Sequence, residues 1–147
     1  TDPFYVINGD IVWFNGLIPA LDRLAAAWDD ERMDALLLMQ RTPSAFGYEG
    51  HGDFFLDPLG LARRRRPREE APLLFAGVQI LHPRLVTQVP SGPFSLNKLY
   101  DRALSDGRLY GIVHDGEWFH VGDPASLTEV DTRIRDSRSG DKRVSHQ

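Results

Sequence analysis

The residues most suited to chemistry lie near the start of the chain, where the apolar run Phe4–Ile7 ends at Asn8-Gly9-Asp10. A short apolar run that stops in this way predicts a buried strand that carries the Asp10 carboxylate to the edge of a sheet. Gly9 allows a sharp turn beside the acid and leaves room for a ligand to approach. In open α/β sheets ligands bind at the carboxyl ends of the strands, where Asp10 would lie. The alternative is a simple turn, because all three residue types form turns.

The composition is that of an ordinary globular protein, with 147 residues of which 41% are hydrophobic and 26% charged. A chain of this length makes one domain or part of one. The net charge of −4 argues against nucleic acid and membrane surfaces as partners, because both repel a negative protein. The chain has no cysteine, which excludes disulfides, thiolate metal sites and a cysteine nucleophile. The absence of cysteine suits a protein of the reducing cytoplasm.

Hydrophobic patterning predicts strands and helices in alternation along the first half of the chain. Apolar positions at helical spacing favour a helix over about 18–33. The continuous apolar run Ala35–Met39 predicts a buried strand next to the first one. Phe54–Asp57 and Leu61–Arg66 flank a Pro-Leu-Gly turn and are predicted to pair as a hairpin.

The second half continues this alternation, with a strand over 73–81, a short helix from 83, a helix over 94–104, and strands over 108–113 and 117–121. Asp115-Gly116 is a two-residue turn signal and predicts that the last two strands pair as a hairpin. Asp123-Pro124 then opens a terminal helix. The domain spans 1–135, and the polar residues 136–147 form a flexible tail. The order of elements predicts an α/β fold with a mixed sheet flanked by helices.

Taken together, these segments resemble the sugar-phosphate nucleotidyltransferases, also called nucleotide-sugar pyrophosphorylases. The likeness is strongest to mannose-1-phosphate guanylyltransferase-like and N-acetylmuramate-1-phosphate uridylyltransferase-like proteins. The matching segments follow the family's order over about residues 4–130: Phe4–Asp10, Gly52-Asp53-Phe54, Phe75–Val78, Pro93–Leu96 and Trp118–Gly122. The resemblance implies the Rossmann-like nucleotide-diphospho-sugar transferase fold. It also implies transfer of a nucleoside monophosphate from an NTP to a sugar 1-phosphate, which yields an NDP-sugar and pyrophosphate.

The same resemblance assigns roles to individual residues. Asp10 would be the catalytic carboxylate and would hold Mg²⁺ through a hard oxygen ligand. Asn8 and Gly9 would contact the substrate on its sugar side. Asp53 lies where an acid of the family contacts the sugar, and the alternative is a capping or turn acid. Glu69 lies where the family often places a further sugar-binding acid, and the alternative is a solvated surface residue.

Two positions depart from the family's pattern. His120 stands where the Trp-x-Asp-x-Gly motif has an acid that serves as the second metal ligand. Imidazole suits Mn²⁺ or Co²⁺ better than Mg²⁺, so His120 is either a metal ligand of altered preference or a hydrogen-bonded neighbour of the site. Asp123 replaces the usual Thr and either adds a carboxylate to the metal or caps the last helix.

The largest departure is the absence of the family's glycine-rich, Arg- and Lys-containing segment that binds the NTP phosphates. The chain also starts at Thr1 without a methionine, as if cut within a larger fold. We therefore expect the sugar-phosphate half of a nucleotidyltransferase that lacks its N-terminal part and is weakly active or inactive alone. The alternative is a non-catalytic sugar-phosphate-binding or regulatory module. The run Arg63–Arg66 is interpreted as a solvated hairpin strand rather than a nucleic-acid site, because acids flank it.

Overall fold

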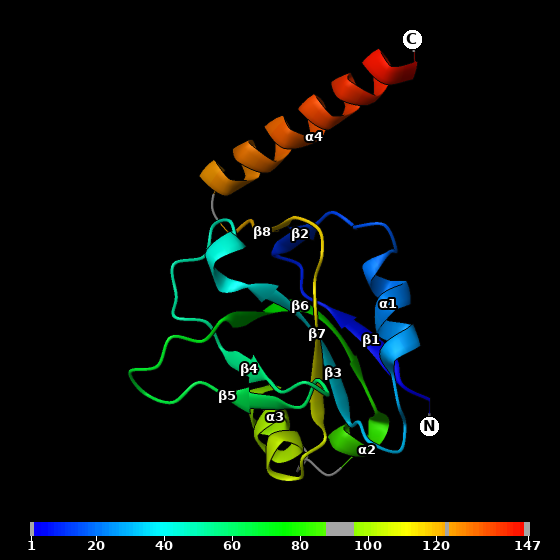
Figure 1. Cartoon of the computed structure of the whole chain (residues 1–147), viewed down its shortest axis with the longest axis vertical. Coiled ribbons are helices and arrows are strands. Elements are labelled where there is room, and N and C mark those ends of the chain that lie inside the picture. The colour runs from blue at the N-terminus through cyan, green and yellow to red at the C-terminus, as the bar shows by residue number, and fades with distance from the viewer. Residues whose placement is uncertain (1, 88–95, 123, 146–147) are drawn as a thin grey trace.

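A computed structural model describes residues 2–87, 96–122 and 124–145. The described part of the chain forms a six-stranded mixed sheet in the order β5-β4-β6-β3-β7, with β1 also paired to β6 (Figure 1). A separate two-stranded sheet pairs β2 with β8. The strands are β1 (Phe4–Ile7), β2 (Ile11–Trp13), β3 (Ala35–Arg41), β4 (Phe54–Leu56), β5 (Ala62–Arg64), β6 (Leu73–Leu81), β7 (Leu109–Val113) and β8 (Trp118–His120). This arrangement confirms the predicted mixed α/β sheet.

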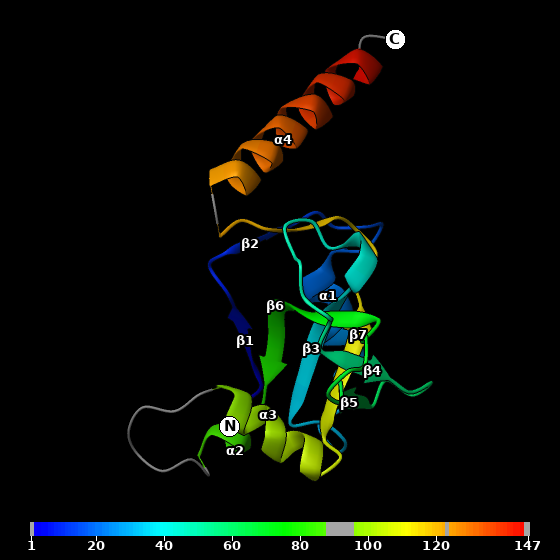
Figure 2. The ribbon, with the colours of Figure 1, turned by 90° about the vertical axis from the view of Figure 1, so that its left-hand side faces the viewer.

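Helices cover both faces of the six-stranded sheet (Figure 2). Because side chains alternate along a strand, β3 sends Leu36 and Leu38 to one face and Leu37 and Met39 to the other. The first face packs against α1 (Ala20–Ala27) and against Trp118 of β8. The second packs against α2 (Pro83–Val86) and α3 (Leu96–Ser105). The core strands β3 and β6 are buried on both faces, which explains their nearly continuous apolar sequences.

One edge of β6 holds two short strands with a gap between them. β1 pairs with the carboxyl-terminal part of β6, from Ile7↔Val78 to Phe4↔Leu81. β4 meets the other end, where Phe54 pairs with Leu73. The edge of β6 between residues 74 and 77 therefore lies between the end of β1 and the start of β4. Because β1 ends there, the residues that follow it enter this gap.

The prediction that the first strand is buried was wrong. β1 lies at the sheet edge, and Phe4, Tyr5 and Ile7 are 40%, 42% and 46% exposed. The prediction that β3 lies next to β1 was also wrong, because both strands pair with β6 and lie on opposite sides of it. Both errors come from sequence order, since β6, which separates the two strands, follows them by more than 30 residues in the chain.

The predicted hairpin of the last two strands does not form. β7 instead pairs in parallel with β3, in register from Ala35↔Leu109 to Met39↔Val113. β8 pairs with β2 in the small sheet. The turn at Gly116 packs so closely on the end of β2 that a Cβ there would lie 1.9 Å from the Phe14 carbonyl oxygen. Asp115-Gly116 thus turns the chain from one sheet into another rather than back along itself.

The helices differ from their predicted bounds. α1 ends at Ala27 rather than near 33, because the carbonyls of Asp30 and Met33 accept hydrogen bonds from Arg84, which lies far along the chain. α3 is described from Leu96 to Ser105, and residues 94 and 95, where this helix was predicted to start, lie outside the described residues. The 3₁₀ turn η1 (Thr42–Ser44) follows β3.

The last helix, α4 (Pro124–Ser145), projects away from the sheets in both views (Figures 1 and 2). Its helical backbone continues through residues 136–145, where the sequence predicted a flexible tail. Within the described residues, no helix is both long enough and apolar enough to span a bilayer.

Candidate functional site

The structure brings Asp10 and His120 together. Nε2 of His120 lies 3.2 Å from Oδ2 of Asp10. The small sheet fixes this pair, because Ile11 is in register with His120 and the Val121 amide donates to the Asp10 carbonyl. Both side chains are accessible, at 57% for Asp10 and 38% for His120. An exposed carboxylate beside an imidazole at the end of a strand can bind a cation or exchange a proton with a ligand.

Asp10 and His120 line a cavity of about 410 Å³ over the gap at the edge of β6. Leu74, Phe75 and Gly77 of β6 also line it, as does Asn8 at the end of β1. The backbone amide of Asn8 donates to the Gly77 carbonyl. This bond holds Asn8 in the cavity wall, where its side-chain amide can donate and accept hydrogen bonds. The position of Asp10 and Asn8 at the carboxyl end of β1 is therefore as predicted.

Gly77 and Trp118 hold this wall in place. Gly77 has φ +85°, and a Cβ there would lie 3.1 Å from Ile11 Cγ1 and 3.3 Å from Asn8 Nδ2. Glycine is thus required both by the backbone and by the close approach of Asn8. Trp118 is 3% exposed, and its indole N–H donates to the Ala76 carbonyl at 2.7 Å. This bond ties β8 to β6 and so positions His120, two residues further on.

Gly9, by contrast, does not have the left-handed backbone that glycine favours. A Cβ at this position would meet nothing within 4 Å. The space beside Asp10 is therefore open, which agrees with the expected approach of a ligand. The turn itself does not require glycine.

The loop from Gly47 to Gly50 supplies two further lining residues, Tyr48 and Glu49, that the sequence analysis did not select. Phe46 anchors the start of this loop, because it bridges to Phe119 and its carbonyl accepts the His120 amide. Burial and, next, the negative charge of Asp53 raise the pKa of the Tyr48 phenol. Tyr48 is therefore a neutral hydroxyl group near pH 7. The sequence signal that could have identified these two residues is their position between two glycines, Gly47 and Gly50.

Glu49 also borders a neighbouring cavity of about 670 Å³, which shares Gly47 and His120 with the first and adds Glu129 of α4. Among the described residues that line the two cavities, the acids are Asp10, Glu49 and Glu129, and none is Lys or Arg. An acidic wall of this kind favours cations over unaccompanied anions. Within the described residues, however, no three His, Cys, Asp or Glu side chains cluster as a metal site.

Asp53 and Glu69 are not brought into this cavity. Asp53 lies at the start of β4, and its Oδ2 accepts the Phe75 amide at 2.9 Å, as the capping alternative expects. Glu69 accepts hydrogen bonds from the Arg63 side chain and the Arg66 amide, as expected of a surface acid. These contacts hold the pKa of Glu69 below its usual value. Asp123 lies outside the described residues.

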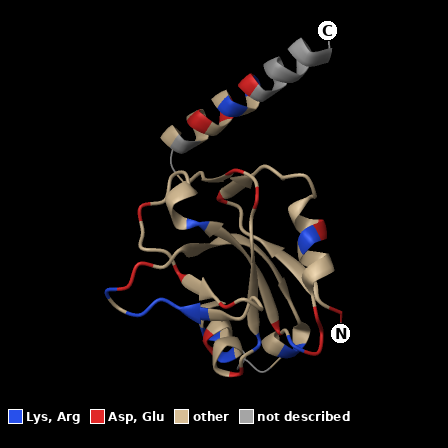
Figure 3. Ribbon diagram, in the orientation of Figure 1, with Lys and Arg blue, Asp and Glu red and all other residues tan. Residues whose placement is uncertain are grey.

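The arginine run begins on β5 with Arg63 and Arg64 and continues into the following loop, where the acids Glu69 and Glu70 come after the basic residues (Figure 3). Arg63 stacks 4.1 Å from the centroid of the Phe55 ring and pairs with Glu69. Arg64 pairs with Asp101 of α3. These neighbours partly neutralise the run, and the Arg64–Asp101 ion pair joins β5 to α3.

Comparison with known proteins gives a family context for this geometry. No protein-family model matches the chain. It is 40% identical over 135 residues to N-acetylmuramate alpha-1-phosphate uridylyltransferase from Caulobacter vibrioides, and the match covers 92% of this chain and 56% of that enzyme. The chain thus spans little more than half the length of this curated relative. The resemblance to sugar-phosphate nucleotidyltransferases is confirmed for the region that the chain spans.

Solved structures agree on the fold. Apo-UDP-glucose pyrophosphorylase superposes with a TM-score of 0.67 at 14% identity, covering 92% of this chain and 55% of that one. HddC from Yersinia pseudotuberculosis complexed with GMP-PN superposes with a TM-score of 0.62 at 15% identity, and the match covers 91% of this chain and 56% of that one. The predicted nucleotide-diphospho-sugar transferase fold is therefore confirmed over this part of the molecule.

Proposed function

We propose that this chain forms the sugar-phosphate side of a nucleotidyltransferase that converts an NTP and a sugar 1-phosphate into an NDP-sugar and pyrophosphate. The observation that carries the proposal is the Asp10–His120 pair in the cavity at the edge of β6. The likeness to the Caulobacter vibrioides enzyme adds a substrate class, N-acetylmuramate 1-phosphate with UTP. The absence of cysteine in the sequence accords with action in the cytoplasm.

The residues of the cavity suit this chemistry. Asn8, with donor and acceptor groups at the cavity wall, would bind sugar hydroxyls or the acyl group of the substrate. The Tyr48 hydroxyl, neutral near pH 7, would donate to the same substrate. Asp10 and His120 lie together in the same cavity wall and would face the phosphate of the substrate. Positioning the two reactants in line is the main catalytic task in phosphoryl transfer.

The acidic wall supports a divalent cation as cofactor, with Asp10 as its carboxylate ligand. Mg²⁺ is commonly held by one or two carboxylates together with substrate phosphates and water, so a single exposed acid fits it. The cation would neutralise the phosphate charges that the cavity residues themselves do not neutralise. His120, at hydrogen-bond distance, orients the Asp10 carboxylate, and its nitrogen would also suit Mn²⁺ or Co²⁺.

The nucleotide side of the active site would come from a part of the fold that this chain lacks. Three observations support this view: the chain covers 56% of its relative, β1 has an exposed apolar edge, and no described cation lines the two cavities. The missing part, upstream by resemblance, would cover Phe4, Tyr5 and Ile7. Without it the chain alone would bind sugar phosphate but transfer little or no nucleotide.

The test is pyrophosphate release from UTP and N-acetylmuramate 1-phosphate by the polypeptide of the complete reading frame, with and without Mg²⁺. Asp10→Asn should lower kcat by about 100-fold or more, because it removes the charge that holds the cation. Asp22→Asn on the exposed side of α1 is the matched control and should leave turnover unchanged. Equal turnover of Asp10→Asn and the control would remove Asp10 from the reaction. Sugar-phosphate binding without turnover would favour the binding-module alternative.

A further inference from the structure

Glu49 is an acid of the candidate site to which the proposed function gives no role. It lines the cavity of about 410 Å³ that holds Asp10 and His120, and it also lines the neighbouring cavity of about 670 Å³. Gly47 and His120 are the other residues that the two linings share. Glu49 therefore lies where the two cavities meet, and a ligand in either cavity would lie near its carboxylate.

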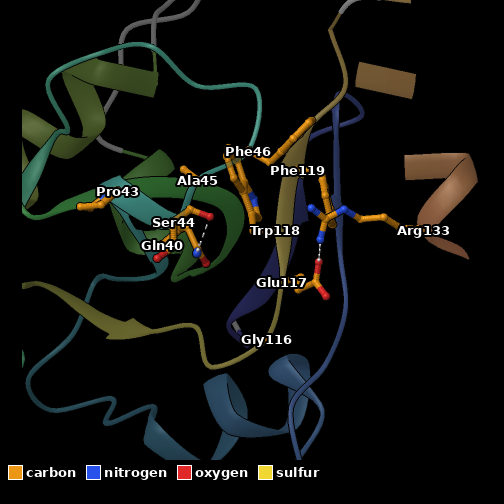
Figure 4. Close-up of a pocket in the computed structure, with 10 residues that line it drawn as sticks. All are labelled: Gln40, Pro43, Ser44, Ala45, Phe46, Gly116, Glu117, Trp118, Phe119 and Arg133. Carbon is orange, nitrogen blue, oxygen red and sulfur yellow. Dashed lines mark hydrogen bonds and ion pairs between the residues drawn. The ribbon is translucent and has the colours of Figure 1, made fainter. Parts of the chain in front are cut away.

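The loop that carries Glu49 is fixed to β8 at its start. The ring centroids of Phe46 and Phe119 lie 5.3 Å apart, and the Arg133 guanidinium lies over both rings (Figure 4). The Phe46 carbonyl also accepts the His120 amide at 2.9 Å. Because Phe46 precedes Glu49 by only three residues, these contacts keep the loop beside the end of β8.

A second set of contacts closes the loop around Glu49. The Tyr48 hydroxyl accepts the Gly52 amide at 3.2 Å. The His51 carbonyl accepts the Ala71 amide at 2.8 Å, which ties the end of the loop to the segment before β6. The backbone of Glu49 is thus held between two fixed points at the cavity wall.

The negative charge of Glu49 is not offset by a neighbour. Its carboxylate forms no ion pair or hydrogen bond within the part of the chain that the structure describes, whereas Glu129 pairs with Arg133. A rounded cavity of 410 Å³ is about 9 Å across, close to the Debye length of about 8 Å at physiological salt. A ligand carboxylate inside the cavity would therefore be only partly screened from Glu49, and the two like charges would repel each other.

We propose that Glu49 is a specificity residue that lowers the affinity of the cavity for sugar 1-phosphates bearing a further carboxylate. This inference rests on the proposed function, which places the sugar phosphate in this cavity. The phosphate is common to all such substrates, so an added carboxylate alone distinguishes them in charge. Among the described residues that line the two cavities, no Lys or Arg is present to pair with that carboxylate.

The test compares two sugars that differ by one acidic group. N-acetylmuramate 1-phosphate has a lactyl carboxylate, and N-acetylglucosamine 1-phosphate is the same sugar without the lactyl group. Pyrophosphate release from UTP by the polypeptide of the complete reading frame gives kcat/KM for each sugar. The ratio of the value for the neutral sugar to that for the acidic sugar cancels any loss that affects both.

Two variants change the charge at position 49 in steps. Glu49→Gln should lower the ratio about threefold and Glu49→Lys about tenfold, because the first removes one unit of negative charge and the second changes the charge by two units. Both effects should shrink at high salt, as expected of a screened charge. A purely structural role of Glu49 would not produce this order or this dependence on salt.

Glu31→Gln and Glu31→Lys are the matched controls. Glu31 is also exposed, lines neither cavity, and its carboxylate has no partner among the residues that the structure describes. These variants change the net charge of the protein by the same amounts and should keep the ratio of the parent. Thermal unfolding verifies that each variant folds.

An unchanged ratio in both Glu49 variants would overturn the inference, as would an equal change in the Glu31 variants. If neither sugar phosphate releases pyrophosphate, the proposed reaction is wrong. The ratio of the two dissociation constants, measured by calorimetry in the parent and in the variants, then tests Glu49 without turnover. Failure of both sugar phosphates to bind would overturn the inference together with the proposed site.

Discussion

Nε2 of His120 lies 3.2 Å from Oδ2 of Asp10, although 110 positions separate the two residues in the sequence. The contact joins the turn after β1 to the end of β8 and places both groups in the same cavity. The Trp-x-Asp-x-Gly motif that residues 118–122 resemble has an acid at the third position, where this chain has His120. We therefore expect this pair to set the metal preference of the proposed site.

Replacement of His120 by an acid should change the preferred metal. In the complete enzyme, His120→Asp should raise the ratio of turnover with Mg²⁺ to turnover with Co²⁺ by about tenfold, because Mg²⁺ prefers oxygen ligands. His120→Asn removes the imidazole nitrogen without adding a carboxylate, so it should raise the ratio less than His120→Asp does. Metal-dependent pyrophosphate release measures it, and an unchanged ratio in both variants would exclude His120 from the metal site.

Asp53 should matter for stability rather than for substrate affinity. Its carboxylate accepts the Phe75 amide in the partly buried edge of β6. Asp53→Ala leaves this amide without its partner and should lower the free energy of unfolding by about 1–2 kcal/mol. Asp53→Asn keeps an acceptor oxygen and should lower it less. Urea denaturation measures both. A large rise in KM for the sugar phosphate with unchanged stability would restore the sugar-binding role.

Asp34 should make the fold sensitive to acid. Burial by itself raises the pKa of the Asp34 carboxyl, but hydrogen bonds and charges from Arg108 and Arg84 outweigh burial and bring the pKa below its usual value. A lowered pKa in the folded state stabilises the protein above the pKa of the unfolded chain, about 4, and this stability is lost as the pH falls through the folded value.

Asp34→Asn should thus lower the unfolding free energy near pH 7 by about 3 kcal/mol, because it leaves two partly buried guanidinium groups without their shared anion. Below about pH 4 the variant should lose less further stability than the parent chain. Urea denaturation at a series of pH values measures both effects. Parallel curves for the two proteins would contradict the role of Asp34.

Gly77→Ala should weaken substrate binding through Asn8. The backbone at this position has φ +85°, which is strained for alanine, and the added methyl group crowds Asn8 and Ile11. The backbone term alone should cost about 1–2 kcal/mol of stability. Gly107→Ala is a close control, because Gly107 also has a positive φ of 65° but a Cβ there meets nothing within 4 Å. Both variants should lose stability, and Gly77→Ala alone should raise KM for the sugar phosphate. Equal KM values for the Gly77→Ala and Gly107→Ala variants would show that Gly77 does not affect substrate binding.

Local patterns predicted those elements whose packing is set by their own sequence. The nine residues of β6 were placed with correct ends, and β4 was predicted one residue too long, to Asp57 instead of Leu56. Elements whose limits depend on residues far away in the sequence were not predicted correctly. α1 ends early because Arg84 and Arg108 bind the carbonyls that follow it. The supposed hairpin at Asp115-Gly116 fails because β7 lies in parallel beside β3, a pairing that no short-range signal encodes.

The same distinction holds for the site. Asn8 and Asp10 follow a strand and therefore lie at its carboxyl end, as the sequence indicated. The surroundings of Asp53 and Glu69 depend on the tertiary structure. The Phe75 amide donates to the Asp53 carboxylate, and the Arg63 side chain donates to that of Glu69. Tyr48 and Glu49 were missed because a loop carries no periodic pattern. Their place in the cavity follows from the pairing of Phe46 with β8.

The small ribbon of β2 and β8 holds Asp10 beside His120, because the Val121 amide donates to the Asp10 carbonyl and Ile11 is in register with His120. The Trp118 indole fastens this ribbon to Ala76 of β6, one residue before the carbonyl that holds Asn8. A substitution that disturbs this point of attachment would therefore shift the charged pair as a unit relative to Asn8, and substrate affinity would fall although neither charged group had been altered.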